Sequence, residues 1–365
     1  MKITSFRLDL LEVPLRTPFK TALRTVAAVH DVVVTIVTDS GHSGHGSAAP
    51  TAAITGETHG SIIAAIRGYI APSLTGREVA DFNETTEAVQ RALQGNHSAK
   101  AAVDIALHVL FGQLQGVPLF RVLGGSPRVL ATDITISVDE VDKMVADALE
   151  AVGRGFAALK VKIGKHFPTD VDRIKAIHAA VGGRALLRLD ANQGWTPKQA
   201  VRAMRELERA GVQLDLLEQP VAARDIDGLK FVTDRVQVPV MADESVFSSL
   251  DAIEIIRRRA ADIINIKLMK AGGIGNALRI ADIAAAHGVE CMIGCMLESS
   301  IGIAAAAHVA LARPGVVTRV DLDGPALCLR DPVTSGVSFD GPRITVSDAP
   351  GLGFTAIDGL RAVPE

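Results

Sequence analysis

Three carboxylates stand at the ends of three successive apolar runs. The run LLRLD ends in Asp190, LDLLE ends in Glu218 and VPVMAD ends in Asp243. One such aspartate would be explained as a helix cap or loop charge, but three in succession are less easily explained in that way. Carboxylate oxygens without a histidine or cysteine suit a hard cation. The sequence therefore predicts that these three side chains bind one Mg²⁺ per chain.

Lysines end two further apolar runs. Lys160-Val161-Lys162 closes one run, and Lys267 closes the run IINIK. Residues two apart on a strand point to the same side, so the first two amines share a face. A solvated charge pair at a strand end is the alternative. A lysine near a cation and another ammonium group is expected to have a lowered pKa, as a general base requires. The pattern predicts removal of a proton beside a carboxylate.

The elements that must position these residues form a regular series. Eight apolar runs alternate with helical stretches after residue 130, a pattern typical of a parallel sheet buried on both faces. The runs are 131–137, 157–163, 185–190, 213–218, 238–243, 262–267, 289–297 and 317–321. Eight such units predict an α/β fold, a (β/α)₈ barrel whose active site lies at the carboxyl ends of the strands.

The segments on either side of the barrel have a different pattern. Residues 1–125 predict an α+β capping domain with strands at 3–13 and 31–38, followed by helices at 57–70, 81–93 and 98–114. The barrel is expected to span 126–323. In the tail, 324–365, the sequence GVSFD-GP-RITV predicts a hairpin. We expect this tail to return to the capping domain.

Six short motifs carry a resemblance to a known family. They are Lys160-Val161-Lys162, Asp190-Ala191-Asn192, Glu218-Gln219-Pro220, Asp243-Glu244-Ser245, Lys267 with Ala271-Gly272-Gly273, and Glu298-Ser299-Ser300. Together they resemble the muconate lactonizing enzyme subgroup of the enolase superfamily over essentially the whole chain. The resemblance implies that Lys162 and Lys267 exchange protons on opposite faces of a substrate whose carboxylate Lys160 helps to hold. It also implies Mg²⁺ ligation by the three carboxylates, with Asn192 and Glu244 as supporting residues near the metal and Glu298 lining the site from the end of the seventh strand.

A second pair of carboxylates narrows the expected substrate. Asp321 and Asp323 are two apart after the eighth run and share a face, although a turn could also explain them. This Asp-x-Asp resembles the dipeptide epimerases, in which it binds the free ammonium group of the substrate. We also expect Thr135, at the end of the first barrel strand, to contact the substrate.

A loop of the capping domain is expected to cover the barrel mouth at residues 16–30. It contains Lys20 and Arg24, and Lys20-Thr21-Ala22-Leu23-Arg24-Thr25 resembles the loop of epimerases that act on L-Ala-D/L-Glu. An ordinary basic surface loop is the alternative. In the functional interpretation the Arg24 guanidinium pairs with an acidic substrate side chain, because the two groups form matched hydrogen bonds.

These residues predict a dipeptide epimerase that inverts the α-carbon of the second residue by proton transfer between two bases. A lyase or cycloisomerase of the same superfamily, of the o-succinylbenzoate synthase or muconate cycloisomerase type, is the main alternative. It would need one base and no ammonium receptor. A Schiff-base lyase and a barrel that binds metal without catalysis are two further alternatives.

Composition excludes other classes of partner. The chain has 365 residues, 48% of them hydrophobic, and a formal net charge of −3, which gives no sign of nucleic-acid binding. No apolar run approaches the roughly 20 residues that cross a bilayer. The odd number of cysteines, 3, favours a reducing compartment, so we expect a cytoplasmic protein. We also expect a homo-oligomer that acts on a small molecule.

Overall fold

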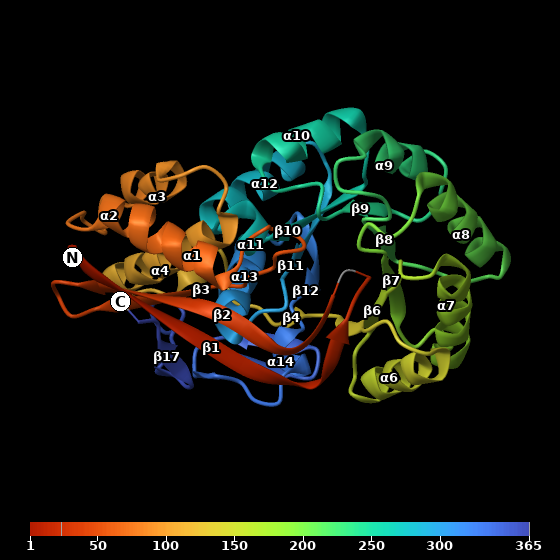
Figure 1. The fold of residues 1–365 in the computed structure, drawn as a ribbon, viewed down its shortest axis with the longest axis horizontal. Coiled ribbons are helices and arrows are strands. Elements are labelled where there is room, and N and C mark those ends of the chain that lie inside the picture. The colour runs from red at the N-terminus through yellow and green to blue at the C-terminus, as the bar shows by residue number, and fades with distance from the viewer. Residues whose placement is uncertain (23, 365) are drawn as a thin grey trace.

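The structure is a computed structural model that describes residues 1–22 and 24–364. An antiparallel sheet with helices on one side lies beside a barrel of eight parallel strands (Figure 1). No helix in the described part of the chain combines the length and the apolar character that a membrane span requires.

The first sheet is built around a long hairpin. β1 (Ile3–Lys20) pairs with β2 (Thr25–Thr38), which pairs with β3 (Ser43–Ala48), all antiparallel. The predicted strands at 3–13 and 31–38 therefore lie next to each other in one antiparallel sheet. Its apolar face packs on the helices α1 (His59–Ala65), α2 (Ala71–Leu74), α3 (Phe82–Arg91) and α4 (His97–Gln115), with a π-helical turn at Ile66–Ile70. The short helix α5 (Leu119–Val122) follows.

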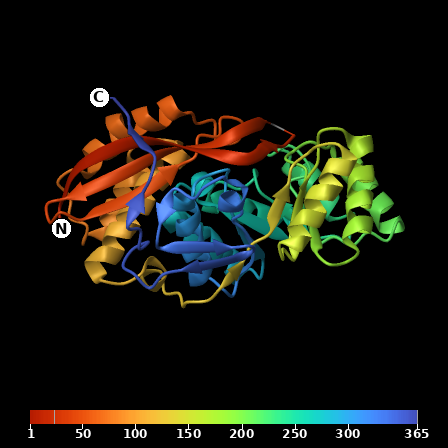
Figure 2. The same ribbon diagram turned by 90° about the horizontal axis from the view of Figure 1, so that it is seen from below.

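The segment 16–30 is not the loop that the sequence suggested. Most of it belongs to β1 and β2, whose pairing resumes at Phe19 and Val26 after a register shift beyond Pro14. Backbone pairing thus carries the hairpin well past the rest of the sheet, and Figure 2 shows it reaching toward the barrel helices. β1 ends at Lys20 and β2 begins at Thr25; Leu23, part of the predicted loop motif, lies outside the described residues.

The eight barrel strands occur where the sequence predicted them. They are β5 (Ile134–Ile136), β6 (Ala158–Lys162), β7 (Leu186–Asp190), β8 (Leu216–Glu218), β9 (Val240–Ala242), β10 (Ile263–Lys267), β11 (Glu290–Gly294) and β12 (Val317–Asp321). They pair in chain order, so the predicted (β/α)₈ barrel is confirmed. Between the first and last strands, Asp133 N donates to Val320 O at 3.3 Å, and Leu322 N donates to Thr132 Oγ1 at 2.8 Å.

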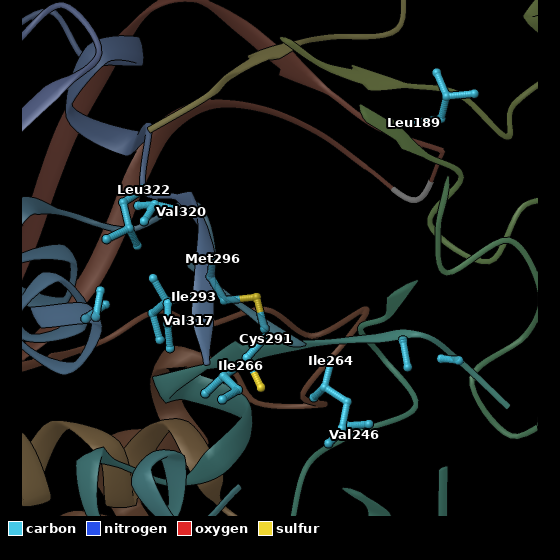
Figure 3. Packing of buried hydrophobic residues seen from close by; sticks show 14 of the residues in the cluster. Leu189, Val246, Ile264, Ile266, Cys291, Ile293, Met296, Val317, Val320 and Leu322 are labelled. Carbon is cyan, nitrogen blue, oxygen red and sulfur yellow. The ribbon is translucent and has the colours of Figure 1, made fainter. Parts of the chain in front are cut away.

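Alternation along each strand separates the core from the barrel interior. Ile264, Ile266 and Ile293 point outward and pack under the surrounding helices (Figure 3). The residues between them, such as Asn265 and Lys267, point inward. The helices are α6 (Val141–Gly153), α7 (Phe167–Val181), α8 (Pro197–Arg209), α9 (Ile226–Thr233), α10 (Ser249–Arg258), α11 (Leu268–Ala271), α12 (Ile274–Ala286), α13 (Ser300–Ala312) and α14 (Gly324–Leu327).

The tail contacts both parts of the molecule. The expected hairpin consists of β14 (Val337–Asp340) and β15 (Arg343–Val346), and β15 pairs with β4 (Leu130–Ala131) just before the barrel. β13 (Val333–Thr334) pairs with β16 (Ala356–Ile357). The last strand, β17 (Leu360–Ala362), pairs with β1 of the first sheet. The tail therefore joins the capping sheet through β17, while its hairpin packs beside the start of the barrel.

Glycine permits one of the contacts between the two parts. Gly273 has a φ of 124°, and a Cβ there would lie 2.4 Å from Asp104 Cγ. The Asp104 carboxylate instead accepts a hydrogen bond of 2.6 Å from the backbone N–H of Ile274, at the start of α12. The Ala271-Gly272-Gly273 motif thus lets α4 of the cap dock closely on the barrel.

Candidate active site

A pocket lies at the carboxyl ends of the barrel strands beneath the tip of the β1–β2 hairpin. About 590 Å³ of space between its lining residues is free of protein atoms, and part of that space is open solvent. Its polar lining comprises Thr21, Arg24, Thr135, Lys160, Lys162, Asn192, Lys267, Cys295, Asp321 and Asp323. Three strands that are distant in sequence therefore bring the predicted lysines and the Asp-x-Asp pair to one cavity.

Lys160 and Lys162 point into the barrel from β6, as the spacing predicted. The Lys162 Nζ lies 2.5 Å from Asp190 Oδ2, and the Lys160 Nζ lies 2.7 Å from oxygens of both Glu218 and Asp321. All five side chains are buried. The adjacent ends of β6, β7 and β8 bring these groups together, because Lys162 is level with Asp190 and Asp190 with Glu218.

Lys267 has a neighbour that the sequence interpretation missed. Both Lys267 and Lys270 place Nζ 2.7 Å from the carboxylate of Asp243, on different oxygens. Lys270 also donates to the Asn265 carbonyl at 3.0 Å and is fully enclosed. It stands one helical turn after Lys267, in α11, and this three-residue spacing was the available signal.

In this structure the pKa of Lys160 and of Lys267 is raised, whereas the sequence led us to expect a lowered pKa beside a bound cation. Burial lowers the pKa of both, but nearby carboxylates outweigh it and raise the pKa above its ordinary value. The strongest attraction comes from Asp321 for Lys160 and from Asp243 for Lys267. The expectation assumed a cation on the carboxylates, which would weaken this attraction.

The three predicted metal ligands form the floor beneath the lysines. Asp190, Glu218 and Asp243 are completely buried. Burial and repulsion from Asp190 raise the pKa of Glu218 to about 8. Burial would also raise the pKa of Asp243, yet the ammonium groups of Lys267 and Lys270 hold it well below its usual range. The carboxylates are thus balanced by lysines.

This floor fits a hard divalent cation in its chemistry. Its donors are all oxygens, and neither Glu218 Oε2 nor Asp243 Oδ1 accepts a hydrogen bond from a described residue. Each faces an ammonium group, which a cation would replace as counter-charge. Within residues 1–22 and 24–364 the acidic side chains do not form a ready-made metal cage. The residue types, rather than the present arrangement, therefore fit Mg²⁺.

Supporting side chains fix these carboxylates. Asn265 Nδ2 donates to Glu218 Oε1 at 2.9 Å, and Gln219 Oε1 accepts from Asp243 N at 2.9 Å. Asn192 Nδ2 donates to Glu244 Oε1 at 3.3 Å. Burial and the nearby Asp243 raise the pKa of Glu244 to about 7. Asn192 and Glu244, predicted as supporting residues, thus contact each other beside the floor.

Asp321 and Asp323 form the wall next to β5. Asp321 accepts from Lys160, while Asp323 Oδ2 accepts from the Thr135 backbone N–H at 2.7 Å. Burial tends to raise the pKa of both, but Lys160 lowers that of Asp321 below its ordinary value. The pKa of Asp323 stays raised, through burial and the charge on Asp321. The wall is a compact anionic surface that faces the pocket.

The hairpin tip supplies the roof. Lys20 does not enter the pocket: its Nζ lies 2.6 Å from Asp139 Oδ2, and its carbonyl accepts from Val138 N. These contacts fasten the tip to the loop after β5. Arg24 lines the pocket, is half-buried and pairs with no carboxylate among the described residues. Burial lowers its pKa.

Glu298 was expected to line the site, but it lies behind the pocket. Its Oε1 accepts from Met296 N at 2.8 Å, and burial together with the charge of Asp31 raises its pKa to about 8. Asp31 belongs to β2 and accepts from Ser299 N at 3.0 Å. Glu298 therefore stands at the junction between cap and barrel, and it is absent from the described pocket lining.

Lysines on two strands above a carboxylate floor, at the carboxyl ends of a (β/α)₈ barrel, are groups that can exchange protons with a bound molecule. Residues 4–124 match the mandelate racemase / muconate lactonizing enzyme N-terminal domain, and residues 143–358 match the enolase C-terminal domain-like family. The chain belongs to the mandelate racemase / muconate lactonizing enzyme family of the enolase superfamily.

Relatives of known activity agree with the resemblance. An L-Ala-D/L-Glu epimerase from Clostridium acetobutylicum is 50% identical, covering 95% of this chain and 97% of that protein. A substrate-liganded L-Ala-D/L-Glu epimerase from Bacillus subtilis superposes with a TM-score of 0.95 at 46% identity over 100% of both chains. An Enterococcus faecalis dipeptide epimerase complexed with Mg and L-Leu-L-Tyr gives 0.93 at 42%, covering 97% and 99%. The chain is an isomerase of the racemase and epimerase type.

Proposed function

We propose that this enzyme epimerises a dipeptide at the α-carbon of its second residue, and that L-Ala-D/L-Glu is its substrate. One observation carries the proposal: Asp321 and Asp323 lie in the same pocket as Lys162 and Lys267. A one-base lyase or cycloisomerase needs no receptor for an ammonium group. The Asp-x-Asp wall gives a positively charged amino end a place to bind, at a fixed position relative to the lysines.

The roles of the residues follow from their positions. Asp190, Glu218 and Asp243 would hold Mg²⁺, with Asn192 and Glu244 beside them. When bound, the ion supplies positive charge that stabilises negative charge on the substrate carboxylate. Thr135 and the Asp-x-Asp wall would bind the amino end.

Proton transfer is assigned to two lysines on different strands. One of Lys162 and Lys267 removes the α-proton, which leaves an enediolate, and Lys160 offsets its charge. The other lysine then delivers a proton to the opposite face and inverts the centre. Two bases are needed because one base would return the proton to the face it left.

Substrate preference is assigned to the roof. The Arg24 guanidinium lines the pocket without a carboxylate partner among the described residues, so an acidic second residue would supply one. This supports glutamate over an apolar residue at that position. The E. faecalis relative, in contrast, was complexed with L-Leu-L-Tyr.

Isotope exchange tests the proposal. The enzyme with Mg²⁺ and L-Ala-L-Glu in D₂O should remove the glutamate α-proton signal and produce the other diastereomer, both followed by NMR. K162A and K267A should each abolish epimerisation, and either one could retain exchange from one isomer. K165A removes an exposed lysine three residues from Lys162 and should remain active. Normal epimerisation by both single variants would refute the two-base mechanism.

We place the protein in the cytoplasm as a homo-oligomer. Cys291, Cys295 and Cys328 are free thiols, as is usual in a reducing compartment. Light scattering of the purified protein would give its oligomeric state, and a monomeric mass would contradict this expectation.

A further inference from the structure

A second group of charged side chains lies deeper in the barrel than the candidate active site. Asp133 Oδ2 lies 2.7 Å from Arg188 Nη1, and Arg188 Nε lies 2.8 Å from Asp215 Oδ2. Asp133 and Arg188 are both buried. Arg188 points inward because it lies two residues before Asp190 on β7. None of these side chains lines the described pocket or belongs to the carboxylate floor.

The opposite half of the barrel interior is apolar at this depth. Leu216, Met241, Ile263 and Met292, from β8 to β11, form a small buried cluster of their own. Apolar side chains fill a barrel without the desolvation cost of buried charges. A protein with a buried ion pair is often no more stable than one with apolar residues in its place. Stability alone therefore does not account for the Asp133–Arg188 pair.

The pair is instead connected to the Asp-x-Asp wall. Asp133 N and Arg188 Nη1 both donate to the carbonyl of Val320, at 3.3 and 3.4 Å. Val320 directly precedes Asp321. Two residues beyond Asp133, the Thr135 N–H donates to Asp323. Backbone and side chain thus fasten both ends of the wall to the segment that bears Asp133.

The carboxyl group of Asp133 is also electrostatically coupled to the wall. Its Oδ1 is buried and accepts no hydrogen bond from a described residue. Burial raises its pKa, and the next largest effect is repulsion from Asp321, which Arg188 opposes. The carboxyl group of Asp133 is therefore close enough to Asp321 for each to affect the other, and Arg188 favours its charged form.

We propose that Asp133, held by Arg188, is a positioning residue for the ammonium group of the substrate. It fixes the strand end that carries Asp321 and Asp323, without touching substrate. The inference rests on the proposed dipeptide substrate. It predicts that loss of Asp133 affects ligands with a free amino end selectively.

The test compares two ligands that differ by one ammonium group. L-Ala-L-Glu is assayed as substrate, and N-propionyl-L-glutamate, its analogue without the amino group, as competitive inhibitor. D133N should raise KM for the dipeptide about tenfold, because weakening the contact with Arg188 releases the strand end that carries the ammonium receptor, with kcat nearly unchanged. The inhibition constant of the propionyl compound should change less than about twofold.

D215N is the matched control. It removes the other carboxylate of Arg188, which also pairs with Arg319 of β12 and, among the described residues, has no hydrogen bond or ion pair with the segment that bears Asp133, by the same isosteric change. It should lower thermal stability while leaving both binding constants near wild type. The inference is overturned if D133N weakens both ligands in parallel, or if D215N reproduces the selective loss.

A further variant covers the case in which D133N does not fold. R188K keeps the charge but loses the planar fork that reaches both Asp133 and Asp215. It should show the same selective rise in KM for the dipeptide, and equal effects on the two ligands would overturn the inference. If the wild-type enzyme epimerises no dipeptide, the proposed function itself is refuted. If the wild type is active and D133N affects both ligands equally, only the role of Asp133 is refuted.

Discussion

Acid should lower the free energy of unfolding through His308, a buried histidine of α13 that packs on Phe120 of α5. Its Nδ1 accepts a hydrogen bond of 2.9 Å from the Phe120 backbone N–H, and its ring stacks on Phe120 with centroids 5.6 Å apart. Burial lowers the pKa of His308 from 6.5 to about 3. The folded protein therefore holds this side chain neutral at pH values where the unfolded chain binds a proton.

The sign and size of the effect follow by linkage. A depressed folded pKa contributes stability above pH 6.5 that is lost progressively as the pH falls toward 3. At pH 5 the solution is about 1.5 units below the unfolded pKa, so protonation of the unfolded chain lowers the free energy of unfolding by about 2 kcal/mol. Below pH 3 the loss reaches about 5 kcal/mol, because 3.5 units at about 1.36 kcal/mol each are then involved.

H308Q removes the titrating group and leaves an acceptor for the Phe120 N–H. Urea unfolding of wild type and variant at pH 7.5 and pH 5.0 gives the change in unfolding free energy for each. The wild type should lose about 2 kcal/mol more than H308Q over this interval. H287Q, at an exposed histidine, should behave like wild type. An equal pH dependence in wild type and H308Q would refute the reasoning.

Three further changes have defined outcomes. R24M should lower kcat/KM for L-Ala-L-Glu about a hundredfold by removing a charge-assisted contact, with little change for L-Ala-L-Leu, and parallel losses would contradict the assignment. Dialysis against EDTA should abolish epimerisation and Mg²⁺ should restore it; activity that survives would favour Schiff-base chemistry. G273A should cost about 3 kcal/mol by thermal unfolding, because its Cβ meets Asp104, whereas G288A, with open space, should cost about 1 kcal/mol. Equal costs would show that the contact with Asp104 does not matter.

Local patterns were sufficient to predict the barrel and to locate most residues of its candidate site. Apolar runs that end in Asp190, Glu218 and Asp243 indicate strands whose carboxyl ends converge, and the two-residue spacing of Lys160 and Lys162 indicates a shared face. These features recur once in each strand-helix unit of the barrel and at every second residue of a strand, so a local pattern reveals them. In the structure, ion pairs join Lys160 to Asp190 and Glu218, and Lys162 to Asp190, while Asp243 pairs with Lys267.

Features that depend on contacts between distant segments were not predictable in this way. The segment 16–30 resembled a loop, because no local pattern shows that β1 and β2 continue to pair beyond Pro14. Lys20 and Arg24 are both basic, yet only their partners across the fold separate an anchor on Asp139 from a pocket residue.

The lysines show most clearly what each level decides. The sequence by itself determined that Lys160, Lys162 and Lys267 end barrel strands near three carboxylates, because strand position and side-chain direction are periodic properties. Only the tertiary structure decided their electrostatics: Lys270 arrives from α11 to share Asp243, and Asp321 arrives from the eighth strand to pair with Lys160. A pKa depends on all charges within a few ångströms, and those neighbours are brought together by folding rather than by adjacency in the chain.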